Sequence, residues 1–173
     1  EVGWSGVLGW SGAKLPRWRP VAGGDVEVRN SSIPGAGQGL FARSALPQWS
    51  ILPPYQGEFM TSTELARRRY TPQMDYVWCP RRRKELFNLS DEALRSGPAS
   101  REPTFCVDSQ KLSVDNPARY LNAARSREQC RAVNVEICEL GQVAYFRTTE
   151  EVPAGGELLT EYGENYWEEF DGC

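Results

Sequence analysis

The sequence contains no histidine at any of its 173 positions. Histidine is the usual general base in Ser-His-Asp and Cys-His nucleophile pairs, and it is a common ligand in catalytic zinc sites. All of these mechanisms are therefore excluded. Any chemistry has to use Tyr, Asp, Glu, Lys or Cys side chains, backbone groups or a bound cofactor.

Long apolar runs and paired cysteines are also missing. No apolar stretch approaches the roughly 20 residues needed to cross a bilayer, so we expect no membrane association. The five cysteines form no CxxC pair and no zinc-finger spacing, and we expect no metal site. Their odd number and the lack of a signal peptide favour a reduced, intracellular compartment. Because the sequence starts with Glu1, we expect it to be cut from a longer protein.

The charge pattern gives little support for nucleic-acid binding, because the net charge is −3. Basic residues cluster at 67–69 and 81–84, and acidic residues are frequent after position 149. Such groups are commonly solvated surface, although an acidic segment also attracts a basic peptide. A nucleic-acid surface on the arginine runs is the least favoured interpretation, because no aromatic side chains are interleaved with them.

The length fits one domain with its own core. The 16 glycines and 12 prolines are spread between short apolar runs, which predicts a mostly β domain with many turns. We expect an irregular, Gly- and Trp-rich lead-in at 1–24 and a domain at 25–170. Within it, residues 79–104 are polar and read as a variable insertion, and 171–173 form a tail that is consistent with truncation.

Apolar residues alternate with polar ones at 26–29 and 133–138, which predicts half-buried strands. Further strands are expected at 75–78, 105–108, 143–148 and 157–159, with a turn at 153–156. A capping-box pattern at 61–64 predicts a short helix through about Arg69. Helical turns are expected near 91–95 and, after Pro117, within 116–124.

Four separated segments are the most informative part of the sequence. They are SSIPGAGQGLFA at 31–42, PYQGE at 54–58, RYLNAAR at 119–125 and GGELLTEYGENYW at 155–167. In this order they resemble the SET-domain family, whose pattern is a Gly-rich turn, a YxG element, an R-F-I-N-H segment and a final E-L-x-x-D-Y. The resemblance covers about 26–167 and is strongest to the PR-type branch, in which the Asn is followed by a small residue and then Ala-Arg.

The resemblance implies a SET fold, with several small curved sheets, few short helices and a pseudoknot-like crossing of the RYLN and EYG segments. It also implies methyl transfer from S-adenosylmethionine to a protein lysine. Residues that match the cofactor-binding positions of the family are Ala36, Gly37, Gln38, Gly39, Leu40, Tyr55, Arg119, Tyr120, Asn122, Ala123, Tyr162 and Trp167.

Two of these features also have plainer interpretations. A turn with Gly35, Gly37 and Gly39 lets the backbone approach a ligand, but taken alone it is more often an ordinary β-turn. Because no helix follows it, neither a P-loop nor a Rossmann fingerprint fits. Asn122 taken alone is more often a helix cap than a ligand contact. Ala123 departs from the histidine found in many SET domains, but the PR-type branch also lacks that histidine.

Tyr162 falls on the catalytic tyrosine of the family. An ordinary lysine, with a pKa of about 10.4, is mostly protonated at neutral pH, and a narrow apolar channel lowers that pKa. The enzyme then has to align nitrogen, methyl and sulfur. The Tyr162 hydroxyl can accept weak C–H···O contacts from the methyl group, whereas the high pKa of tyrosine makes it a poor general base.

Aromatic side chains are expected to line the lysine channel, because their faces stabilise a cationic ammonium. The candidates are Tyr76, Tyr145, Phe146 and Tyr166, each of which is also a plausible core residue. The expected substrate is a basic protein, by family analogy a histone tail in the nucleus. The alternative is a SET-like domain that has lost activity and acts as a protein-interaction module, as Ala123 and the missing zinc-binding cysteines would allow.

Overall fold

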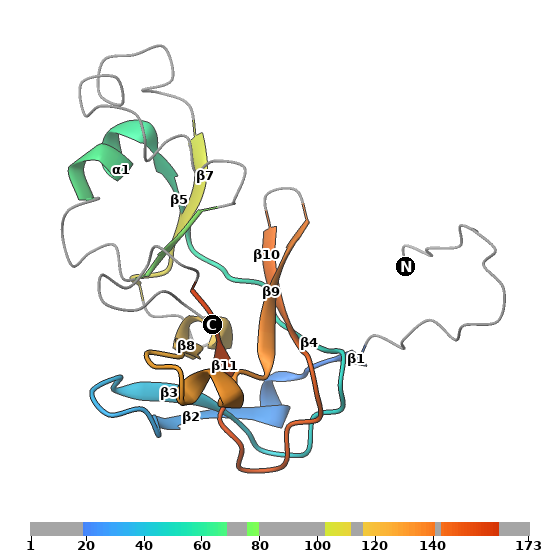
Figure 1. Cartoon of the computed structure of the whole chain (residues 1–173). Helices are drawn as coiled ribbons and strands as arrows, with labels where there is room; N and C mark the ends of the chain where they lie inside the picture. Colours follow the sequence, from blue (N-terminus) through green and yellow to red (C-terminus); the bar gives the residue numbers. More distant parts are fainter. Residues whose placement is uncertain (1–18, 69–75, 80–102, 112–115, 141–142, 163–173) are drawn as a thin grey trace, which may run out of the picture.

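The computed structural model describes residues 19–68, 76–79, 103–111, 116–140 and 143–162, and Figure 1 shows the course of the chain. The strands are β1 (Arg19–Pro20), β2 (Val26–Asn30), β3 (Gln38–Ala42), β4 (Ser50–Leu52), β5 (Glu58–Thr61), β6 (Val77–Trp78), β7 (Pro103–Asp108), β8 (Asn122–Ala123), β9 (Val135–Leu140), β10 (Val143–Thr148) and β11 (Leu159–Thr160). The helices are α1 (Ser62–Arg68) and the 3₁₀ turns η1 (Gly23–Asp25), η5 (Pro117–Tyr120) and η6 (Gln129–Ala132).

The strands form four small sheets. Their orders are β1-β4-β10-β9, β2-β3, β5-β7-β6 and β11-β8. The pairs are antiparallel except β1 with β4 and β11 with β8, which are parallel. The expected fold class, mostly β with several small sheets and few short helices, is confirmed.

One hydrophobic core joins the β2-β3 hairpin to the four-stranded sheet. Its fully buried members include Leu40 of β3, Leu52 of β4 and Leu158 before β11. Burial of a leucine side chain contributes about 1.5–3 kcal/mol, so these contacts fix the hairpin beneath the sheet. Tyr55 and Tyr120 pack against the edge of this core.

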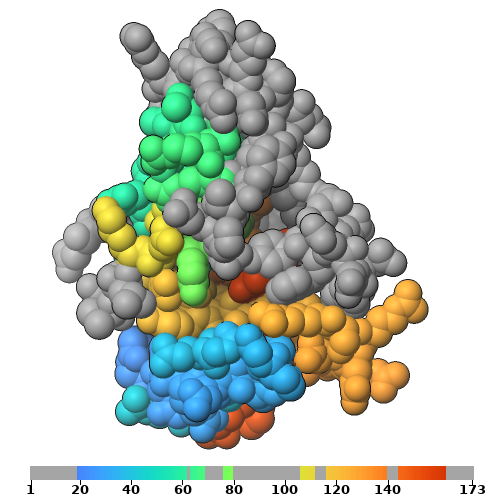
Figure 2. All heavy atoms as spheres, turned by 90° about the vertical axis from the view of Figure 1, so that its left-hand side faces the viewer, coloured from blue at the N-terminus to red at the C-terminus, as the bar shows by residue number. Residues whose placement is uncertain are grey.

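A second, smaller core lies under α1, in the lobe formed by β5, β7 and β6 (Figure 1). It contains Met60, Leu65, Ala66 and Cys106. Figure 2 shows this lobe above the β2-β3 hairpin, with the layer of residues that follows β7 between them. The described residues therefore form two apolar centres, and Tyr55, which packs against the first, lies on the segment that leads from β4 to β5 of the lobe.

The lobe also contains a disulfide between Cys79 and Cys106. The odd cysteine count favours a reduced compartment and does not predict this bond. The pairing of Trp78 with Val107 in antiparallel register places the neighbouring Cys79 opposite Cys106. Spacing along the sequence does not reveal this proximity, because it depends on the register of two short strands.

Most of the expected elements are present with shifted ends. The strands at 26–29 and 143–148 are confirmed, and the capped helix begins at Ser62, with the Glu64 amide donating to Thr61 Oγ1 at 3.2 Å. The helical turn after Pro117 ends at Tyr120. The turn expected at 91–95 and most of the insertion and lead-in lie outside the described residues, so the domain boundaries remain predictions. In the part of the chain that the structure describes, none of the helices is long and apolar enough to span a membrane.

Candidate functional site

The glycine-rich turn connects β2 to β3. Gly35 and Gly37 have φ angles of 75° and 74°, in the left-handed region that favours glycine. The Ser31 amide donates to the Gly37 carbonyl at 2.8 Å and closes the turn. Of the other residues assigned here to the cofactor, Gln38, Gly39 and Leu40 open β3, and Leu40 is fully buried in the main core.

Asn122 brings the RYLN segment to this turn. Its Nδ2 donates to the Gln38 carbonyl at 3.0 Å and approaches Glu157 Oε1 at 3.4 Å. Its neighbour Ala123 is buried and pairs with Thr160 in the parallel β8-β11 sheet. Two predicted segments, far apart in the sequence, therefore meet through one side-chain amide.

Glu157 was not singled out from the sequence, although it opens the ELLTEY segment. Its carboxylate accepts hydrogen bonds from the Ser31 hydroxyl at 2.6 Å, from the Ser32 amide at 2.8 Å and from the Ser32 hydroxyl. A Cβ at Gly39 would lie 2.2 Å from Glu157 Oε1. The sequence does contain a signal for a contact of Glu157 with the turn. The final motif carries this acidic side chain, and two hydrogen-bond donors, Ser31 and Ser32, stand just before the glycines of the first motif.

Tyr162 lies at the end of the same segment. Its hydroxyl donates to the Leu121 carbonyl at 2.6 Å, which fixes the ring beside the residue that precedes Asn122. The residue is 37% exposed, so the ring remains accessible to a ligand. The contact of the RYLN and EYG segments implied by the resemblance is thus made by the β8-β11 pairing and by this hydrogen bond.

Four other predicted residues, Tyr55, Tyr76, Arg119 and Tyr120, form a cluster on the side of the lobe. The Tyr55 hydroxyl donates to the Tyr76 carbonyl at 2.8 Å, and the Arg119 guanidinium lies 4.1 Å from the centre of the Tyr76 ring. Arg119 Nε also donates to the Ser109 carbonyl at 2.8 Å, and its guanidinium lies 5.3 Å from the ring of Tyr120. These contacts join the lobe to η5, which ends two residues before Asn122.

The two predicted channel residues of β10 point in opposite directions, because side chains alternate along a strand. Phe146 is buried in the main core, with its ring centre 6.3 Å from that of Tyr55. Tyr145 is on the other face, beside Cys138 of β9, and burial together with this thiol raises the pKa of its hydroxyl. At most one of the two can face a given channel. Trp167 and Tyr166 lie outside the described residues, and Ala36 is half-buried in the glycine-rich turn.

The residues around Asn122 fit a polar, amino-acid-like ligand group. Among the described side chains, the Thr160 hydroxyl is buried and makes no hydrogen bond, and it stands on β11 next to Ala123. Such a buried hydroxyl is costly unless another group binds it. Thr160 pairs with Ala123 and not with Asn122, so its side chain lies on the other face of the β8-β11 pair, and the fit to an amino-acid-like group rests on the Asn122 amide and the backbone of the glycine turn. In the described part of the chain, no three His, Cys, Asp or Glu side chains are grouped to hold a metal ion.

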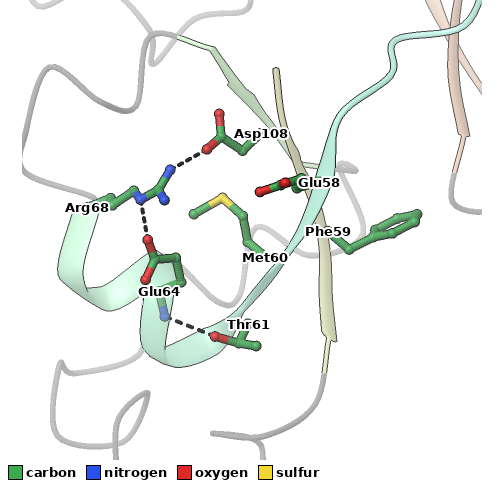
Figure 3. A pocket seen from close by; sticks show the side chains of 7 residues that line it. All are labelled: Glu58, Phe59, Met60, Thr61, Glu64, Arg68 and Asp108. Atoms are coloured by element: carbon green, nitrogen blue, oxygen red, sulfur yellow. Dashed lines mark hydrogen bonds and ion pairs between the residues drawn. The ribbon is translucent and has the colours of Figure 1, made fainter. Parts of the chain in front are cut away.

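A separate cavity of about 260 Å³ lies in the lobe and contains none of the predicted site residues (Figure 3). Its lining is Glu58, Phe59, Met60, Thr61, Glu64, Arg68 and Asp108. Arg68 forms ion pairs with both Glu64 and Asp108, and so ties α1 to β7. Two of the three carboxylates are thereby engaged in holding the lobe together.

The Arg68 network predicts an acid-sensitive contribution to stability. Burial raises the pKa of Glu64, but the hydrogen bonds and charges of Arg67 and Arg68 outweigh it, so the pKa lies below its ordinary 4.5. The contribution is therefore complete above about pH 4.5 and is lost as the pH falls through the lowered value. In Glu64→Gln we expect the free energy of unfolding, measured by urea titration at several pH values, to fall less steeply in acid. The same change at exposed Glu150 is the control, and equal slopes in both variants and the wild type would contradict the assignment.

The fold and the site define a SET-type domain. The chain belongs to the PR domain family: the family model described as PR domain zinc finger protein 2, PR domain, matches residues 26–172. It is similar to histone-lysine N-methyltransferase PRDM16 of Homo sapiens, with 23% identity over 149 residues, covering 83% of this chain and 10% of that protein. It is also similar to putative histone-lysine N-methyltransferase PRDM6 of Bos taurus, with 22% identity over 153 residues, covering 88% of this chain and 22% of that protein. The chain thus spans a small part of the length of these relatives.

Solved structures give the same fold. The methyltransferase domain of human PR domain-containing protein 2 superposes with a TM-score of 0.54 at 19% identity, covering 84% of this chain and 82% of that one. ATXR5 in complex with histone H3.1 mono-methylated on R26 superposes with a TM-score of 0.55 at 14% identity, covering 84% of this chain and 60% of that one. The ctPRC2 complex bound to S-adenosylmethionine superposes with a TM-score of 0.51 at 22% identity, covering 81% of this chain and 15% of that one. At these identities the likeness establishes the fold alone.

Proposed function

We propose that this domain transfers a methyl group from S-adenosylmethionine to the side-chain amine of a protein lysine. One observation carries the proposal: Asn122 is hydrogen-bonded to the glycine-rich turn, while Tyr162 is hydrogen-bonded to the residue just before Asn122. The three elements that the sequence marks for cofactor and catalysis are therefore adjacent. The naming of PRDM16 as a histone-lysine methyltransferase supports the same reaction.

Each part of the site has a role in this proposal. When bound, S-adenosylmethionine supplies an electrophilic methyl group on a sulfonium. The backbone of the turn and the Asn122 amide would hold its polar end. The Tyr162 ring, fixed through its hydroxyl, would position the methyl group for in-line attack by a neutral amine, which is an orientation effect. The Arg119 guanidinium, 4.1 Å from the ring centre, would hold the predicted channel residue Tyr76 in place.

We further propose a histone tail as the substrate and the nucleus as the location. The histone-lysine methyltransferase names of PRDM16 and PRDM6 and the ATXR5 complex with histone H3.1 support this choice. A basic tail is also electrostatically suited to a chain with a net charge of −3. A binding-only role, without catalysis, is the competing outcome of the test below.

The test is transfer of radiolabelled methyl groups from S-adenosylmethionine to histone H3 and to an H3 tail peptide, followed by amino-acid analysis. We expect label on lysine, and none on a matched peptide whose lysines are replaced by arginine. Label on the second peptide would contradict lysine specificity. A folded protein that binds the peptide but transfers nothing would support the interaction-module alternative.

A further inference from the structure

Glu157 occupies the point where the glycine-rich turn, β3 and the RYLN segment meet. Its backbone is fixed there, because Glu157 bridges to Phe41 of β3 and the following Leu158 amide donates to the Leu40 carbonyl at 2.8 Å. On the outer side, Arg29 Nη2 donates to the Gly155 carbonyl at 2.6 Å. The carboxylate is therefore held against the hairpin from a segment more than a hundred residues away.

From this position the carboxylate binds the start of the turn through three donors. They are the hydroxyl and the amide of Ser32 and the hydroxyl of Ser31. The Ser31 hydroxyl in turn accepts a hydrogen bond from the Ile33 amide at 3.0 Å, so the hydrogen-bond network of the carboxylate extends to Ile33. Hydrogen bonds to a charged group are shorter and stronger than neutral ones, so these contacts hold the start of the turn firmly.

The same carboxylate also faces Asn122. Asn122 Nδ2 lies 3.4 Å from Glu157 Oε1 and 3.0 Å from the Gln38 carbonyl, so the amide is oriented by both groups. Gly39 leaves the space for this arrangement, since a Cβ there would lie 3.1 Å from Asn122 Nδ2 as well as against Glu157. Glu157 thus connects the two elements that are proposed to bind the cofactor.

We propose that Glu157 is a positioning residue that holds the glycine-rich turn and the Asn122 amide in the arrangement that binds S-adenosylmethionine. This inference rests on the proposed function. It predicts that Glu157 acts on cofactor affinity through Ser31, Ser32 and Asn122, and not on the binding of the protein substrate. The effects of substituting Glu157 and of substituting the two serines on cofactor affinity should therefore be non-additive.

The test compares the wild type with Glu157→Ala, Glu157→Gln, the double variant Ser31→Ala/Ser32→Ala, and the combination of this pair with Glu157→Ala. S-adenosylmethionine affinity is measured by calorimetry on each folded protein. We expect Glu157→Ala to raise Kd by about 10- to 100-fold, because all three donors of the turn lose the carboxylate that holds them. Glu157→Gln, which keeps one carbonyl oxygen, should have a smaller effect. The combined variant should be no weaker than Glu157→Ala, since the serines act through the same carboxylate.

Two further readouts separate positioning from general stability. The matched control is Glu136→Ala, which removes a glutamate paired with Arg147 (2.5 Å) on the four-stranded sheet, and it should leave Kd unchanged. Amide hydrogen exchange at Ser32 should be protected in the wild type and accelerated in Glu157→Ala, with no cofactor present. The KM for an H3 peptide at saturating cofactor should stay at the wild-type value.

The outcomes distinguish this inference from the proposed function. Wild-type affinity in folded Glu157→Ala, or unchanged exchange at Ser32, would overturn the positioning role and leave the proposed function intact. A folded wild type that does not bind S-adenosylmethionine would overturn the proposed function and this inference with it. Weaker binding in Glu157→Ala with an unchanged KM for the peptide would support both.

Discussion

Tyr162→Phe is expected to lower the rate of methyl transfer by about 100-fold, the cost of a misplacement of around 1 Å in a reacting group. The variant removes the hydroxyl that donates to the Leu121 carbonyl at 2.6 Å and keeps the ring. Without this bond the ring is no longer fixed beside the RYLN segment, and the weak C–H···O contacts to the methyl group are lost. The rate is measured with radiolabelled S-adenosylmethionine and an H3 peptide.

The control readouts for this variant are cofactor affinity and thermal unfolding. The Tyr162 ring is partly exposed, so loss of one hydroxyl should leave the fold intact. Cofactor affinity should stay within about threefold of wild type, because a single neutral hydrogen bond is worth about 0.5–1.5 kcal/mol and this one lies within the protein. Transfer at the wild-type rate would remove Tyr162 from the catalytic residues.

Gly39→Ala is expected to disrupt the site by displacing the Glu157 carboxylate. The new methyl group would lie 2.2 Å from Glu157 Oε1, so the carboxylate has to leave Ser31, Ser32 and Asn122. The backbone need not move, because the atom displaced is the end of a flexible side chain. We expect the free energy of unfolding to fall by about 1.5–3 kcal/mol, the worth of a hydrogen bond to a charged group, and cofactor Kd to rise at least about tenfold.

The matched control is Gly23→Ala in η1. A Cβ at Gly23 meets no atom within 4 Å, so the same chemical change is made without a collision. Urea unfolding and calorimetry on both variants separate the collision at Gly39 from the general effect of replacing a glycine. Equal behaviour of the two variants would contradict the packing of Glu157 against Gly39.

The strands that were predictable carry their signal in consecutive residues. Val26 and Val28 alternate with Glu27 and Arg29, and this segment is β2. In contrast, β4 was missed, because its three residues are followed by two prolines and its pairing partner, β10, lies more than ninety residues away. The strand expected at 157–159 is found at Leu159–Thr160, because its ends are set by the parallel pairing with β8.

The site was predictable to the extent that motifs identify individual residues. Asn122 and Tyr162 were singled out, and the structure joins Asn122 to the glycine-rich turn and Tyr162 to the neighbouring Leu121, although their roles stay predictions. Glu157 was not singled out, because its importance depends on contacts with Ser31 and Ser32 from a distant segment. The opposite directions of Tyr145 and Phe146 follow from strand alternation and could have been anticipated.

The central claim is that the glycine-rich turn and Asn122 together form a cofactor site, and calorimetric titration with S-adenosylmethionine tests it most directly. The wild type and Asn122→Ala are titrated side by side, with thermal unfolding to show that both are folded. We expect saturable 1:1 binding by the wild type and an affinity at least about tenfold weaker in the variant, since the amide that joins the two elements is lost. Absence of binding by the folded wild type, or equal affinity in the variant, would contradict the claim.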